Sequence, residues 1–127
     1  MRKRIESFKH AIRGIRMVLS SEKNMQIHLI FGILVVFFGL LFCISPVEWM
    51  ICLLAFGLVM GAEMINTAIE TVVDLVSPDH HELAGKAKDI AAGAVLLSSF
   101  FAALVGLIIF VPRGIMLLQT LWGYLAD

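Results

Sequence analysis

Hydrophobic residues in this chain form one amphipathic segment followed by three long apolar runs. Between residues 2 and 19 the apolar side chains recur at steps of three and four, which is the period of an amphipathic helix. These side chains are Ile5, Phe8, Ile12, Ile15 and Leu19. Basic residues flank the stripe, as in a helix that lies in a membrane interface. A helix packed on a partner protein is the alternative.

The three apolar runs are each long enough to cross a bilayer. They predict membrane-spanning helices at residues 27–44, 47–76 and 90–111, and a polar hinge at residues 20–26 precedes the first of them. His28 is the only ionisable residue of the first span. Because it lies at the start of that span, we expect an interfacial group rather than a ligand.

Prolines mark the ends of the predicted spans. Pro46 separates the first span from the second, because proline cannot continue a helix from the preceding turn. Ser77 and Pro78 are expected to cap and begin the next helix. Pro112 is expected to end the third span, so that residues 114–127 form a separate, mildly amphipathic tail.

Composition agrees with an all-α integral membrane protein of one domain. The 127 residues are 60% hydrophobic and 16% charged, and their mean hydropathy is +0.94, which is more apolar than a soluble domain of this size. Cys43 and Cys52 fit no metal or redox motif, and no cleavable signal peptide is apparent. Nucleic acid is not expected as a partner, because no basic face with interleaved aromatics occurs outside the N-terminal segment.

The uneven placement of basic residues predicts the orientation in a bacterial cell membrane. Seven of the ten Lys and Arg residues precede the first apolar run, although the formal net charge is zero. The positive-inside rule places this segment, Lys86 and Lys88 in the cytoplasm. The turn at residues 45–48 has no Lys or Arg and is expected outside. Three spans then place the C-terminus outside as well.

One face of the second span carries polar residues. At about 100° per residue, Glu63, Asn66, Glu70 and Asp74 fall on one helical stripe. Acids within a span are costly and usually face a bundle interior or a water-filled site. These groups are also able to hydrogen-bond helices together, but three acids and an amide are too many for that role alone.

Carboxylates from three positions, Glu22, Glu63 and Glu70, are expected to converge at the cytoplasmic interface. Oxygen ligands suit a hard cation such as Mg²⁺, which also takes phosphate oxygens. Lys88 adds positive charge nearby, and a carboxylate desolvated at lipid depth is suited to act as a general base. The residues therefore predict metal and phosphate on the water side and a proton acceptor on the lipid side. There is no P-loop and no kinase glycine loop.

Two stretches resemble the signatures of the prokaryotic diacylglycerol kinase family. Residues 63–74 (EMINTAIETVVD) resemble E-x-x-N-[ST]-A-I-E-x-x-x-D, and residues 81–89 (HELAGKAKD) resemble H-E-L-x-[GK]-x-A-K-D. Residues 14–16 match the family's amphipathic helix, and Glu22 matches its acid before the first span. The resemblance covers about residues 3–112.

The resemblance implies a homotrimer of three-span subunits with composite active sites, which transfers the γ-phosphoryl group of ATP to a lipid hydroxyl with Mg²⁺. It implies that Glu63 is the general base, that Glu22 and Glu70 hold the metal, and that Asn66 orients Glu63 or the substrate. Nucleotide contacts are implied at Lys3, His10, Glu22, Glu70, Asp79, His80, His81, Lys88 and Asp89. Where this chain has His10, a tyrosine is often found in the family.

The family has two substrate branches, which phosphorylate diacylglycerol and undecaprenol. Residues 22–28 (EKNMQIH) resemble the E-x-N-x-x-I-H of the undecaprenol branch, and residues 106–112 are similar to it as well. We therefore favour undecaprenol over diacylglycerol. Two rivals come from other classes: a proton-coupled transporter with Glu63 as proton relay, and a membrane scaffold without enzymatic activity. A transporter has no need of Lys88 and Asp89.

Overall fold

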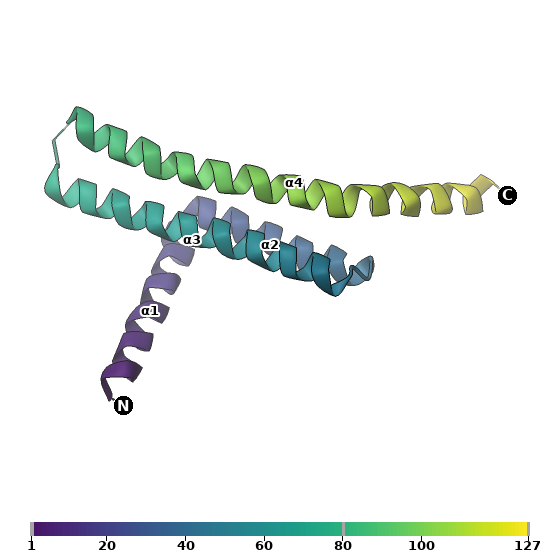
Figure 1. Cartoon of the computed structure of the whole chain (residues 1–127), viewed down its shortest axis with the longest axis horizontal. Coiled ribbons are helices and arrows are strands. Elements are labelled where there is room, and N and C mark those ends of the chain that lie inside the picture. The colour runs from purple at the N-terminus through teal and green to yellow at the C-terminus, as the bar shows by residue number, and fades with distance from the viewer. Residues whose placement is uncertain (1, 80, 127) are drawn as a thin grey trace.

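The computed structural model describes residues 2–79 and 81–126, and within these ranges the chain is helical with no strand. The helices are α1 (Arg2–Ser21), α2 (Lys23–Leu41), α3 (Pro46–Val76) and α4 (Glu82–Ala126). Helices α2, α3 and α4 run in alternating directions beside one another, whereas α1 leaves them at a steep angle (Figure 1). All three are long and apolar enough to cross a membrane. The prediction of an all-α membrane protein with three candidate spans is confirmed.

The polar hinge before α2 is shorter than predicted, because α1 ends at Ser21 and α2 begins at Lys23. Only Glu22 leaves the helical conformation, with φ −94° and ψ 118°. Its carbonyl oxygen accepts the backbone N–H of Gln26 at 3.2 Å, and the Gln26 side chain donates back to the carbonyl of Leu19 at 3.2 Å. These bonds keep the polar residues after Glu22 helical.

A tight turn joins α2 to α3. Cys43 has a φ of 48°, the left-handed conformation that often ends a helix. Ser45 and Glu48 then form a capping box: the Ser45 hydroxyl accepts the N–H of Glu48 at 3.3 Å, and the Glu48 carboxylate accepts the N–H of Ser45 at 2.8 Å. Pro46 occupies the first turn of α3, where its missing N–H costs nothing.

The prediction that Ser77 and Pro78 begin the next helix is wrong. Ser77 ends α3, where its N–H donates to the Val73 carbonyl, and α4 starts only at Glu82. His81 provides the cap instead. Its Nδ1 accepts the N–H of Leu83 at 3.2 Å, and its carbonyl accepts the N–H of Gly85 at 3.0 Å. A histidine therefore takes the place expected of a serine.

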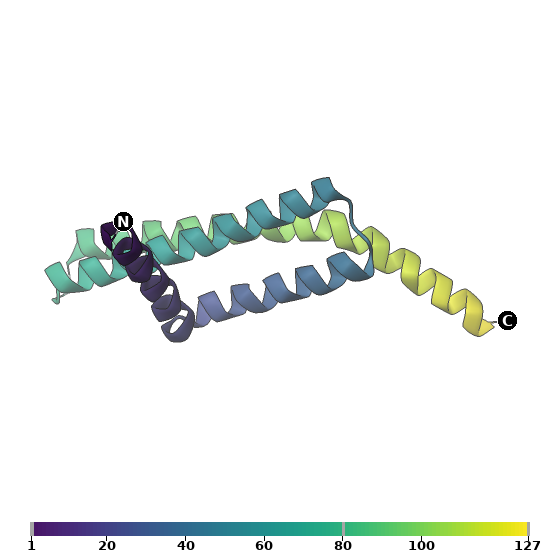
Figure 2. The ribbon, with the colours of Figure 1, turned by 90° about the horizontal axis from the view of Figure 1, so that it is seen from below.

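The prediction that Pro112 ends the third apolar helix, leaving a separate tail, is also wrong. Helix α4 is 45 residues long and continues through Pro112. Arg113 stabilises this region: one guanidinium nitrogen donates to the Ile109 carbonyl at 2.7 Å, and the other lies 2.8 Å from Glu48 Oε1. Proline is tolerated inside a membrane helix when neighbouring groups bind the backbone in this way. The last part of α4 extends beyond α2 and α3 (Figures 1 and 2).

Only a small apolar core forms within one chain. Ile44, Cys52 and Ile109 are buried together where α2, α3 and α4 meet. Most other large apolar side chains are exposed over the length of the three spans. An apolar surface of this extent requires lipid or further subunits to cover it.

Candidate functional site

The polar stripe of α3 is buried at Glu63, which is only 2% exposed. Across from it on α2 lies Met25, which is 1% exposed; these are the largest fully buried side chains in the described part of the chain. Glu63 Oε2 has no hydrogen-bond partner among the described residues. A buried carboxylate oxygen without a partner is costly, and such a group calls for a functional explanation.

Asn66 links Glu63 to the next acid of the stripe. It is 7% exposed, and its Nδ2 donates to Glu70 Oε1 at 3.0 Å. Its Oδ1 is buried without a partner among the described residues. Asn66 therefore orients Glu70 and keeps a free acceptor beside Glu63, as expected from residues one turn apart on a helix.

Glu22 reaches the same region from the junction of α1 and α2. Its side chain makes no cap bond to α2 and accepts only the Ser21 hydroxyl, at 3.0 Å from Oε1. The charges that act on Glu63 come from His28, Glu22 and Glu70. Glu22 and Glu70 therefore each lie within electrostatic range of Glu63.

The acids do not form a complete metal cage. No group of three or more His, Cys, Asp or Glu side chains is arranged to hold a metal ion within the described ranges. A site of two carboxylates that takes further oxygens from a phosphate needs no such group. Glu22 and Glu70 are suited to that kind of site because both offer only hard oxygen donors.

Lys88 lies at the start of α4 and faces the end of α3. Its Nζ is 2.6 Å from Asp74 Oδ1, so the cation predicted for phosphate is paired with the last acid of the polar stripe. Asp79, His81 and Asp89 are exposed around it. His80 lies outside the described residues.

Two residues predicted to contact a nucleotide lie elsewhere. Lys3 and His10 are exposed on α1, and the first half of α1 lies apart from the connection between α3 and α4 (Figure 1). A single chain does not gather them with Lys88.

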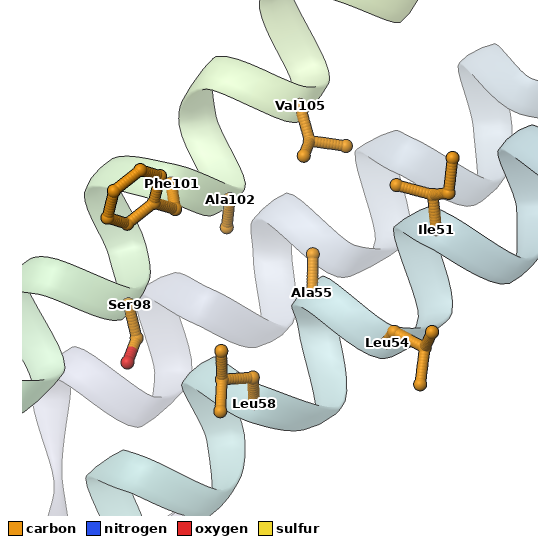
Figure 3. Close-up of a pocket in the computed structure, with 8 residues that line it drawn as sticks. All are labelled: Ile51, Leu54, Ala55, Leu58, Ser98, Phe101, Ala102 and Val105. Carbon is orange, nitrogen blue, oxygen red and sulfur yellow. The ribbon is translucent and has the colours of Figure 1, made fainter.

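Two apolar cavities lie between α3 and α4, and they extend along α3 from Ile51 to the polar stripe at Asn66. One of about 280 Å³ opens between Leu54, Leu58 and Phe101 (Figure 3). A second of about 510 Å³ continues from Leu58 and Ser98 up to Asn66. Small residues line much of the second cavity: Gly57, Gly61, Ala62, Ala87, Ala91 and Ala94. An apolar path therefore leads along α3 to the buried polar groups.

Two features of this region were missed from the sequence. Asn24 and His28 both face Glu63 from α2, although His28 was interpreted as an interfacial group. His28 follows Met25 by one helical turn, but the sequence does not show that this face of α2 meets α3. The pair between Glu48 and Arg113, at the other end of the bundle, carried no local signal either.

Known proteins are similar to this chain over the region that contains residues 63–74 and 81–89. The family model for prokaryotic diacylglycerol kinase matches residues 9–110. An undecaprenol kinase of Bacillus subtilis is 44% identical over 108 residues, which are 85% of this chain and 88% of that protein.

Diacylglycerol kinases are similar as well. One from Synechocystis is 39% identical over 107 residues, which are 84% of this chain and 61% of that protein. One from Haemophilus influenzae is 26% identical over 101 residues, which are 80% of this chain and 86% of that protein. The residues matched by the family model include the whole of α3, which carries the polar stripe.

Proposed function

Since the chain belongs to the prokaryotic diacylglycerol kinase family and is therefore a membrane lipid kinase, we propose that it phosphorylates undecaprenol with Mg-ATP. Diacylglycerol is the alternative acceptor. The observation that carries the proposal is the buried Glu63 carboxylate, which has an unpaired oxygen among the described residues and lies beside the Asn66–Glu70 pair. A transporter or a scaffold offers no reason for the pair between Lys88 and Asp74 at the end of the same stripe.

Glu63 is the proposed general base. It is buried on α3 one turn before Asn66, and Asn66 lines the apolar cavity between α3 and α4. A lipid hydroxyl that reaches Glu63 meets a carboxylate shielded from water. Removing the hydroxyl proton there makes the oxygen a better nucleophile toward the terminal phosphate. Asn66 positions the groups around that oxygen.

Glu22 and Glu70 are the proposed ligands of Mg²⁺. The donor set fits a hard cation, because the Glu22 carboxylate is not used in a helix cap and Glu70 is oriented by Asn66. When bound, Mg²⁺ would offset the negative charge of the ATP phosphates.

The nucleotide is proposed to bind around the connection between α3 and α4. Lys88 supplies positive charge, and the neighbouring polar residues are Asp79, His80, His81 and Asp89. Lys3 and His10 on α1 are proposed to contact ATP from a neighbouring subunit, because α1 points away from this connection within its own chain. We therefore propose a homotrimer with composite sites, which would also cover the exposed apolar surface.

The orientation follows from charge. The N-terminal segment and the connection between α3 and α4 carry Lys and Arg and are proposed to lie in the cytoplasm, whereas the C-terminus lies outside. Helix α1 is proposed to lie in the membrane interface. ATP and the proposed site are then on the same side of the membrane.

Glu63→Gln tests the proposal. We expect turnover to fall by about 100- to 10,000-fold, as when a general base is removed, while ATP still binds. The readouts are phosphate transfer from labelled Mg-ATP to undecaprenol in micelles and nucleotide binding on the same sample. Glu6→Gln, an exposed acid on α1, is the matched control. Undiminished transfer by Glu63→Gln would remove Glu63 as the base, and ATP-independent solute flux in vesicles would favour a transporter.

A further inference from the structure

Two close approaches fix how α2 and α3 lie against each other. A Cβ atom added to Gly39 would lie 2.7 Å from the Trp49 ring, and one added to Gly32 would lie 2.4 Å from the Phe56 ring. The same number of residues separates the two glycines as separates the two aromatic residues. The two helices therefore run antiparallel in a constant register over this distance (Figure 2).

The same register extends to the buried end of the polar stripe. One further step of equal length leads from Gly32 to Met25 on α2 and from Phe56 to Glu63 on α3. Both of these side chains are fully buried, as facing positions require. His28 follows Met25 by one turn, about 4.5 Å along the helix axis, and is partly buried on the same face.

Glu63 needs a hydrogen-bond donor that its own helix does not supply. Its Oε2 is unpaired among the described residues, and its charged neighbours Glu22 and Glu70 accept but do not donate when ionised. On α2, the Asn24 side chain bonds the carboxylate, and the His28 imidazole lies within electrostatic range of it. The His28 imidazole is able to donate a hydrogen bond, unlike the two ionised acids, and it lies one turn deeper in the apolar part of α2 than Met25.

We propose that His28 is the residue that positions the Glu63 carboxylate, by donating from its imidazole so that one oxygen remains directed toward the lipid hydroxyl. The inference rests on the proposed function, since it assigns to His28 a role in the same reaction. Asn24 on α2 also bonds the carboxylate, so His28 would be the donor for Oε2, the oxygen that is unpaired among the described residues. A donor from α2 fixes its orientation and leaves Asn66 free to hold Glu70.

The test compares His28→Leu and His28→Gln with the unchanged protein, in micelles containing undecaprenol and Mg-ATP. We expect His28→Leu to lower kcat by about 10- to 100-fold, the loss of one hydrogen bond to a charged group, while the KM for ATP stays unchanged. His28→Gln retains an N–H donor and should recover most of kcat. Lys23→Leu, at an exposed position of α2, is the control for a polar-to-leucine change.

The outcomes separate the inference from the proposed function. If the unchanged protein phosphorylates no lipid, the proposed function fails. If it is active and His28→Leu keeps its kcat, His28 does not position the base. If His28→Gln is as slow as His28→Leu, or if the loss appears in the KM for ATP, donation to Glu63 is also contradicted.

Discussion

Lys88 Nζ lies 2.6 Å from Asp74 Oδ1, so one ion pair joins the beginning of α4 to the last turns of α3. Both side chains retain contact with solvent, at 36% and 65% exposure. A pair this exposed contributes little to stability, because water screens the two charges. Its importance lies in holding a cation beside the proposed nucleotide site.

Lys88→Met should therefore affect the nucleotide more than the fold. We expect the KM for ATP to rise about tenfold or more with a small change in Tm, because a positive charge that faces phosphate oxygens is lost. Lys86→Met is the control, since Lys86 pairs only with Glu82 on its own helix, at 2.7 Å. Equal effects of the two changes on KM would contradict a specific role for Lys88.

Asn66→Leu should weaken the response to Mg²⁺. The change removes the donor that orients Glu70 and leaves the helix intact. Loss of a residue that orients a metal ligand typically reduces metal affinity by about 10- to 100-fold, and we expect the Mg²⁺ concentration at half-maximal rate to rise accordingly. Thr71→Val removes an exposed hydroxyl bonded only to its own helix and should leave the titration unchanged. If Asn66→Leu leaves the Mg²⁺ titration unchanged, the proposal that Asn66 orients Glu70 as a ligand of Mg²⁺ is contradicted.

Gly39→Ala should destabilise the packing of α2 on α3. The new methyl group would lie 2.7 Å from the Trp49 ring and 3.2 Å from Ile44 Cδ1, which belongs to the buried core. Overpacking of this kind costs about 1–3 kcal/mol, measured as a lower Tm in detergent. Gly106→Ala is the control because nothing lies within 4 Å of the added atom. If Gly39→Ala has a Tm as high as that of Gly106→Ala, the close packing of α2 on α3 at Gly39 does not contribute to stability as predicted.

Arg113→Met should destabilise the end of the bundle opposite the proposed site. It leaves the Glu48 carboxylate, only 23% exposed, without its cation. Removing Arg113 leaves the Glu48 charge uncompensated, so we expect a lower Tm in detergent. Glu48→Gln combined with Arg113→Met should recover part of the decrease in Tm, because no charge is then stranded. If the decrease in Tm of the double variant equals the sum of the decreases in the two single variants, Glu48 and Arg113 are not coupled.

Local rules were enough to predict the polar stripe of α3. Helical periodicity alone places Glu63, Asn66 and Glu70 on one face. It did not predict that the Asn66 amide donates to Glu70, because Asn66 was expected to orient Glu63 or the substrate. The course of α4 through Pro112 was not predictable in this way. It depends on Arg113 meeting Glu48, and that contact joins residues far apart in the sequence.

The start of α4 was mispredicted for a related reason. Ser77 and Pro78 have strong preferences for beginning a helix, but Ser77 closes α3 and its hydroxyl donates to the Asp79 carbonyl at 3.2 Å. His81 then caps α4, a role that residue preferences do not favour. The place of His28 was likewise hidden, because it depends on the register between α2 and α3.

The measurement that tests the central claim most directly is a competition between lipids. Undecaprenol and diacylglycerol are offered together in mixed micelles with labelled Mg-ATP, and the labelled lipids are separated. The account predicts that undecaprenol takes most of the label and that Glu63→Gln labels neither lipid. Preferential labelling of diacylglycerol would contradict the proposed substrate, and a folded, unchanged protein that labels neither lipid would contradict the proposed kinase site itself.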